Sequence, residues 1–114
     1  MMARIMAGID FTVAWVSVPD AKLAEKLARG LVESKLAACV TEIPKTRSHY
    51  VWKGKLESSM EIMLMIKTRR KLMPALERYV KKRHSAQVPE IICVPLAAGS
   101  RDYLQWVRES TASR

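Results

Sequence analysis

The chain has 114 residues, a size that suits one small domain built around one hydrophobic core. Its residues are 49% apolar with only four Gly and five Pro, which excludes a disordered chain, and no segment reaches the roughly 20 apolar residues of a membrane span. Twenty Lys and Arg against eleven Asp and Glu give a net charge of +9, which favours anionic partners without defining a site.

The two cysteines, Cys39 and Cys93, lie in separate apolar runs. They have neither the CxxC spacing of a metal or redox motif nor the number that a disulfide framework needs. Near the N-terminus, Asp10 interrupts the apolar residues and no clean cleavage site for a secretory leader follows. We therefore expect a soluble cytoplasmic protein with one domain over residues 1–114 and an ordered core at about 11–110.

The N-terminal part of the chain predicts a strand followed by a helix. Residues 11–18 ("FTVAWVSV") are rich in β-branched and aromatic side chains and apolar on both faces, as in a buried central strand. Asp20 can cap a helix over 20–36, where Leu and Ala recur on one face. Gly30 inside this helix costs about 1 kcal/mol relative to Ala, and it indicates close packing against a strand.

The middle of the chain predicts a long hairpin. A second strand begins at 37–44, with Pro44 at a bulge or an edge, where no ladder N–H is needed. It continues to a tight turn at Lys53-Gly54, and residues 55–68 return as the third strand. Each arm is longer than the usual strand of about five or six residues, so we expect the tip to overhang the domain.

The C-terminal part predicts a helix, a strand and a last helix. Residues 71–84 have apolar side chains at helical spacing, with Pro74 tolerated in the first turn. Residues 89–96 form the fourth strand, and 100–110 form a helix with Ser100 as its cap. Three residues of this last helix are expected to face inward: Tyr103, Leu104 and Val107.

These elements define an α+β fold: a ferredoxin-like βαββαβ sandwich with an extra C-terminal helix and a long hairpin between the second and third strands. Helices would cover one face of the sheet. The first strand, at 11–18, and the third, around 60–66, are nevertheless apolar on both faces. An exposed apolar area of that size marks a partner surface, and we expect further copies of the chain to cover it.

Several segments resemble one known family. "VESKLAACVTEIPKTRSHYVWKGKLE", "EIMLMIKT", "VPEII" and "DYLQWV" are similar, in this order, to motifs of the CutA family of divalent-cation tolerance proteins, and the likeness extends from about Phe11 to Ser110. It implies a ferredoxin-like fold assembled as a tight homotrimer, with hairpins that reach neighbouring subunits. It also implies a response to copper and other divalent metals, and inter-subunit ligand clefts like those of the PII signal-transduction proteins.

The resemblance bears on metal binding. Family members that bind copper take ligands from a Cys near the end of the first strand and from a His-His pair after the second helix. Here Val16 and Arg83-His84 stand at those positions. His84 and Cys39 are the metal candidates, and useful affinity needs at least two converging ligands. The simpler interpretations are a surface histidine at a helix C-terminus and, for Cys39 as for Cys93, a buried cysteine that acts as a small apolar residue.

The resemblance also suggests residues for a ligand cleft. Four aromatic residues stand at motif positions of the family, and two charged residues would supply its polar groups. Aromatic side chains have a broad apolar surface, and those of Tyr and Trp also carry a polar group, which suits a ligand site. They equally suit anchors of a subunit interface. The six candidates are Tyr50, Trp52, Lys67, Glu90, Tyr103 and Trp106.

Other classes of function remain open. No nucleophile–base set, HExxH, GxSxG or glycine-rich phosphate loop occurs, so we expect a protein that is not an enzyme. The basic runs "KTRRK" and "KKR" and the strand order would fit an RNA-binding module, but the third strand offers Met, Leu and Ile instead of aromatic rings for base stacking. A trimeric scaffold or signalling protein that binds partners or a small molecule, and no metal, is the main alternative.

Overall fold

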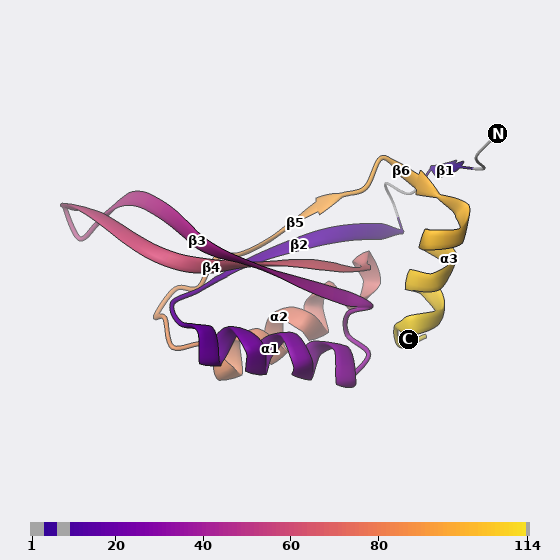
Figure 1. Ribbon diagram of the computed structural model, residues 1–114, viewed down its shortest axis with the longest axis horizontal. Helices are drawn as coiled ribbons and strands as arrows, with labels where there is room; N and C mark the ends of the chain where they lie inside the picture. The colour runs from indigo at the N-terminus through magenta and orange to yellow at the C-terminus, as the bar shows by residue number, and fades with distance from the viewer. Residues whose placement is uncertain (1–3, 7–9, 114) are drawn as a thin grey trace.

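The computed structural model of the chain describes residues 4–6 and 10–113. Four strands form an antiparallel sheet in the order β3-β4-β2-β5, and helices α1 and α2 cover one of its faces (Figure 1). The strands are β1 Arg4–Met6, β2 Phe11–Val18, β3 Cys39–Trp52, β4 Lys55–Arg69, β5 Ile91–Pro95 and β6 Ala98–Ser100. The helices are α1 Ala21–Glu33, α2 Met73–Arg83 and α3 Arg101–Ser110. The predicted α+β class is confirmed, and the predicted strands and helices occur in the predicted order, with two further short strands, β1 and β6.

Helix α1 begins where the sequence predicts and ends earlier. The Asp20 carboxylate accepts the N–H of Leu23 at 2.8 Å, which confirms the cap. The predicted end at residue 36 is wrong, because the helix stops at Glu33. Lys35 adopts a left-handed conformation with φ 63°, and the Leu36 N–H turns back to the carbonyl of Leu31 at 3.0 Å, as in a Schellman-type helix end.

The later elements differ only at their boundaries. A single 3₁₀ turn over Arg70–Leu72 precedes α2, so the α-helix begins at Met73, with Pro74 in its first turn as predicted. The fourth predicted strand is shorter than 89–96, since its ladder covers only Ile91–Pro95. Ser100 caps α3 as predicted: its hydroxyl accepts the N–H of Tyr103 at 3.3 Å.

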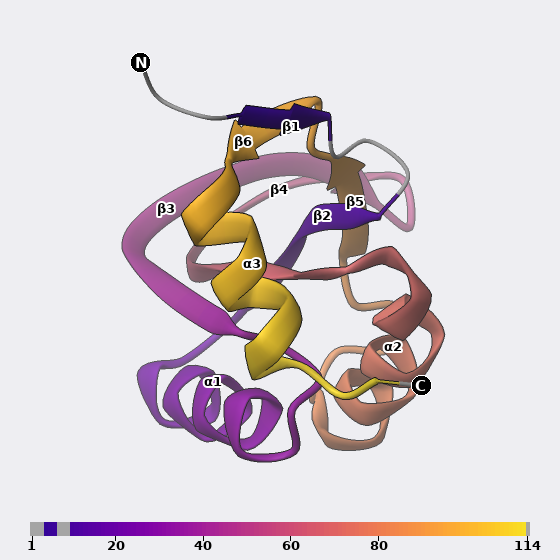
Figure 2. The ribbon, with the colours of Figure 1, turned by 90° about the vertical axis from the view of Figure 1, so that its right-hand side faces the viewer.

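One pairing was not predicted. Strands β1 and β6 form a separate two-stranded antiparallel ladder, with Arg4 opposite Ser100 (Figure 2). Three residues a strand are too few to show an alternating pattern, and only the path of the chain brings these two segments together.

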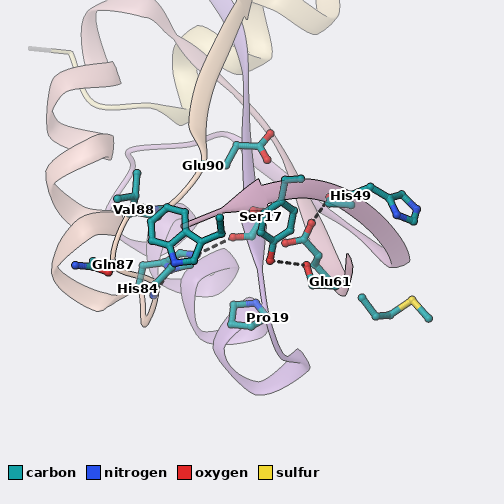
Figure 3. Close-up of a pocket in the computed structure, with 15 residues that line it drawn as sticks. Ser17, Pro19, His49, Glu61, His84, Gln87, Val88 and Glu90 are labelled. Atoms are coloured by element: carbon teal, nitrogen blue, oxygen red, sulfur yellow. Dashed lines mark hydrogen bonds between the residues drawn. The ribbon is translucent and has the colours of Figure 1, made fainter. Parts of the chain in front are cut away.

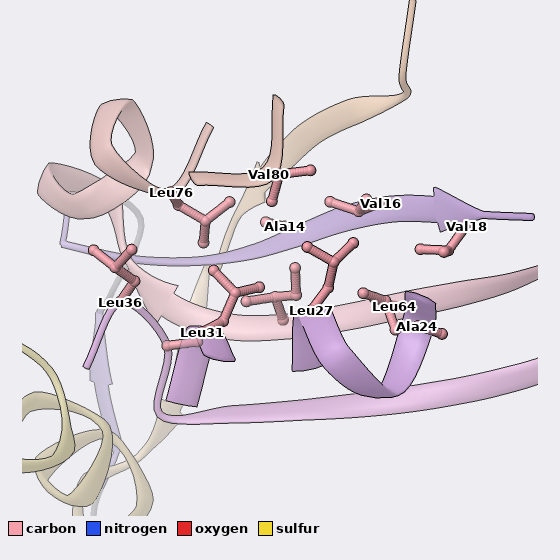
Figure 4. Close-up of a cluster of buried hydrophobic side chains, with 12 residues drawn as sticks. Ala14, Val16, Val18, Ala24, Leu27, Leu31, Leu36, Leu64, Leu76 and Val80 are labelled. Atoms are coloured by element: carbon pink, nitrogen blue, oxygen red, sulfur yellow. The ribbon is translucent and has the colours of Figure 1, made fainter. Parts of the chain in front are cut away.

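The main core lies between the sheet and helices α1 and α2 (Figure 4). Burial of each large aliphatic side chain here contributes roughly 1.5–3 kcal/mol. Its fully buried members include Ala14, Val16 and Val18 from β2, Leu64 and Ile66 from β4, Leu27 and Leu31 from α1, and Leu76 and Val80 from α2.

Three predictions of packing are wrong. Gly30 packs against Tyr79 of α2, not against a strand, because α1 and α2 lie side by side there. Leu104 and Val107 of α3 face inward, whereas Tyr103 is 42% exposed, since it lies at the margin of the buried face of this short helix. Cys93 is exposed, because β5 is an edge strand, and Cys39 is half-buried.

The opposite face of the sheet, here called the open face, is also apolar. Trp15 of β2 lies between Met65 of β4 and Ile92 of β5 in the strand register. Side chains two residues further along a strand, such as Val94, share this face, and Ile92 and Val94 are 53% and 51% exposed. The predicted apolar character of both faces is therefore confirmed, and no helix of the described chain covers the open face (Figure 1).

The hairpin between β3 and β4 extends well beyond the helices, in a molecule that measures 50 × 27 × 22 Å (Figure 1). The register between its arms shifts between Ile43 and Thr46, which confirms the bulge predicted at Pro44. At the tip, Lys53 and Gly54 both have positive φ, as a two-residue hairpin turn of type I′ requires.

Candidate functional site

A cavity of about 670 Å³ lies between the arms of the hairpin, the end of β2 and the segment that follows α2 (Figure 3). This volume is in the range of small-molecule pockets. Three of the predicted cleft residues and one metal candidate line it: Tyr50, Trp52, Glu90 and His84. The structure thus brings together residues more than thirty positions apart in the sequence.

Hydrogen bonds order the hairpin side of this cavity. The Ser48 hydroxyl donates to the Glu61 carboxylate, and the Tyr50 hydroxyl lies 3.4 Å from Ser59 Oγ (Figure 3). Glu61 was not among the residues predicted from the sequence. Its signal was present in "SSMEIML", where Glu61 is the only charged side chain of the run.

His84 closes the other side of the cavity. Its Nε2 lies 2.7 Å from the Ser17 carbonyl oxygen, and its Nδ1 accepts the N–H of Ala86 at 3.0 Å. Because a carbonyl can only accept and an N–H can only donate, this pair of bonds fixes a neutral imidazole with its proton on Nε2. The ring therefore holds the segment after α2 against the end of β2.

The side chains available for a metal centre are few and engaged elsewhere. Both ring nitrogens of His84 are hydrogen-bonded, and Val16 is fully buried in the core. Cys39 lies opposite Lys67 on the neighbouring strand. Over residues 4–6 and 10–113, no group of three or more His, Cys, Asp or Glu side chains is close enough to hold a metal ion. These residues do not fit a copper centre within one chain.

The other predicted cleft residues lie at the far end of the sheet from the hairpin tip. Lys67 Nζ donates to Thr41 Oγ1 at 2.6 Å and lies 3.5 Å from the Met65 carbonyl oxygen. On α3, the rings of Tyr103 and Trp106 are 5.6 Å apart. Partial burial, and secondarily the charge of the Cys39 thiolate, raises the pKa of Tyr103 above its usual value. Within one chain the six candidates therefore form two separate groups.

The chain is similar to known proteins over almost its whole length. Residues 12–110 match the family model described as CutA1 divalent ion tolerance protein. The human Protein CutA is 46% identical over 102 residues, which cover 90% of this chain and 57% of that protein. Protein CutA, chloroplastic, of Arabidopsis thaliana is 43% identical over 99 residues, which cover 87% and 54%. The chain thus spans little more than half the length of these two relatives.

A solved structure agrees. The divalent cation tolerance protein (Cut A1) of Thermus thermophilus matches with a TM-score of 0.87 at 40% identity, covering 90% of this chain and 99% of that one. No helix in the described part of the chain is long and apolar enough to cross a membrane. The cytoplasmic location stays a prediction, because one relative is named as chloroplastic. The resemblance seen in the sequence is confirmed: this chain belongs to the CutA1 family of divalent ion tolerance proteins.

Proposed function

We propose that this protein serves divalent-cation tolerance as a homotrimer of ferredoxin-like subunits, with PII-like clefts between subunits that bind a small ligand and carry out no catalysis. The strand order β3-β4-β2-β5, with two helices on one face, supports the ferredoxin-like part, since it is the order of a split βαβ unit. The observation that carries the trimer is the apolar open face.

The open face exposes several large apolar side chains to solvent. Trp15, Met63 and Met65 are only half-buried, and Ile92 and Val94 are more than half exposed. Contiguous apolar areas of this kind mark association surfaces. Burial of each such side chain contributes roughly 1.5–3 kcal/mol, so a few of them per subunit would hold an assembly together.

A second copy of the chain would also complete the cleft. Tyr50, Trp52 and Glu90 lie at the hairpin end of one subunit, while Tyr103 and Trp106 lie on α3 at the other end. A neighbour whose α3 lies beside the hairpin would bring the two aromatic groups together. In this arrangement the long hairpin serves to reach the adjacent subunit.

The response to metal ions is assigned to the assembly and its clefts. Both ring nitrogens of His84 are bonded, and Cys39 belongs to no group of three or more His, Cys, Asp or Glu side chains among the described residues, so neither supports a copper centre in one subunit. The same observation favours the second candidate, a trimeric scaffold or signalling protein that binds partners or a small molecule and no metal. Bound mass in the native particle distinguishes the two candidates.

Native mass spectrometry of protein purified without added metal tests the proposal. We expect particles of three chains. Any mass in excess of three chains measures the bound metal or ligand directly. Spectra of the denatured protein supply the mass of the bare chain as control. A folded particle with one 12.9 kDa chain at micromolar concentration would reject the trimer and the clefts.

A further inference from the structure

The cavity between the hairpin and the segment that follows α2 has a charge opposite to that of the chain. Two carboxylates, Glu61 and Glu90, line it, and no Lys or Arg of the described residues does, although the chain has twenty Lys and Arg against eleven Asp and Glu. His84 is neutral by its hydrogen bonds, and His49 points away from Glu61 (Figure 3). The cavity is therefore acidic in a strongly basic protein.

The Glu61 carboxylate is positioned rather than free. Its Oε1 accepts the hydroxyl of Ser48, and its backbone carbonyl accepts the Thr46 hydroxyl at 2.8 Å. The side chain is half-buried, and it forms no ion pair within the described residues. A partly desolvated carboxylate without a counter-ion attracts a cation more strongly than one in bulk water.

Aromatic rings line the same cavity. Trp52 and Tyr50 are 42% and 44% exposed, so part of each ring surface is accessible to a ligand. The face of an indole or phenol ring attracts a cation within about 6 Å of its centre. An aromatic wall combined with a carboxylate suits an organic ammonium group. A metal ion would need several converging donors, and the described residues do not provide them.

We propose that this cavity binds an organic cation, a small molecule with an alkylammonium group, through the Glu61 carboxylate and the rings of Trp52 and Tyr50. This inference rests on the proposed ligand cleft and names the chemical class of its ligand. An anionic ligand is disfavoured, because the described lining offers it no cationic side chain. One Lys67 contributed by a neighbouring subunit would still leave more negative than positive charge around the ligand.

Titration calorimetry of the full chain tests the inference with three probes: tetramethylammonium, 1,4-diaminobutane and citrate. We expect one or both cations to bind and citrate not to bind. Binding of tetramethylammonium alone assigns recognition to the ring faces, and binding of the diamine alone assigns it to the carboxylates. Either result supports an organic cation. Binding of citrate alone, or of no probe, overturns the inference.

Variants locate the site. Glu61→Gln keeps an acceptor for the Ser48 hydroxyl and removes the charge, so we expect cation affinity to fall about tenfold. Trp52→Leu removes an aromatic ring from the cavity wall. Because it changes a different position, it supplies a second measurement of cation affinity if Glu61→Gln folds poorly. Glu42→Gln is the matched control, since Glu42 is exposed on the same hairpin and outside the cavity. Unchanged affinity in both cavity variants overturns the inference.

Native mass spectra of the same samples separate this inference from the proposed function. A trimer that binds neither cation rejects the organic-cation inference and leaves the trimer standing. A single chain that binds a cation and loses it in Glu61→Gln rejects the trimer and supports the cation site.

Discussion

Gly30 shows how one contact can outweigh helix propensity. A Cβ at this position would lie 1.9 Å from the hydroxyl oxygen of Tyr79 on α2. Arg83 holds the tyrosine from another side: its guanidinium carbon lies 3.6 Å from the ring centroid, and its Nη1 donates to the Tyr79 carbonyl at 3.0 Å. The ring therefore cannot move away without the loss of its contact with the Arg83 guanidinium.

We expect Gly30→Ala to lower the free energy of unfolding by about 1–3 kcal/mol, as overpacking does, even though alanine is the better helix former. Urea denaturation followed by circular dichroism measures it. In a Tyr79→Phe background, which lacks the hydroxyl, the same change should destabilise less. A Gly30→Ala protein that is more stable than wild type would show that helix propensity outweighs the contact with Tyr79 at this site.

His84 illustrates a residue whose sequence position suggests one role and whose bonds suggest another. Since Nδ1 and Nε2 are both engaged, we expect wild type and His84→Ala to show equal affinity for copper in titration calorimetry. The variant should be less stable by about 1–3 kcal/mol, because the Ser17 carbonyl loses its donor. A marked fall in copper affinity would instead make His84 a ligand.

At the scale of elements, the hairpin turn depends on backbone conformation alone. Lys53 and Gly54 have φ of 52° and 76°, and an added Cβ at Gly54 would meet nothing within 4 Å. Any effect of a side chain there comes from the left-handed conformation, which costs an ordinary residue about 1–2 kcal/mol.

We expect Gly54→Ala to lower the free energy of unfolding by about 1 kcal/mol, measured by urea denaturation. Lys53→Asn is the control at the adjacent position, since asparagine tolerates positive φ, and it should leave stability unchanged or slightly raised. Equal stability of wild type and Gly54→Ala would contradict the left-handed conformation of the turn.

The elements themselves follow closely from local sequence. The two helix caps, the bulge and the hairpin turn could be predicted because each depends on residues within a few positions of itself. They lie at Asp20, Ser100, Pro44 and Lys53-Gly54. The end of α1 was missed, since an apolar pattern continues through Leu36 while the backbone already turns at Lys35. The β1–β6 pair was missed because its partners are over ninety residues apart.

At the scale of the whole molecule, the open face decides how the chain associates. We expect Ile92→Lys, on the exposed part of this face, to dissociate the proposed trimer or weaken it strongly, because a buried unpaired charge is costly. Val32→Lys on α1, at 41% exposure outside the open face, is the matched control. Native mass spectrometry measures the subunit count. A trimer that persists in Ile92→Lys would place the interface elsewhere.

By itself, the sequence determined the α+β class, the order of elements, the apolar character of both sheet faces and the family, since periodicity, caps and motifs are local patterns. Only the tertiary structure decided that Glu61 joins Tyr50 and Trp52 in an acidic cavity, that His84 bonds through both nitrogens, and that Tyr103 and Trp106 lie far from that cavity. These facts depend on contacts between segments distant in sequence, where a local pattern carries no information about distance or the direction of a side chain.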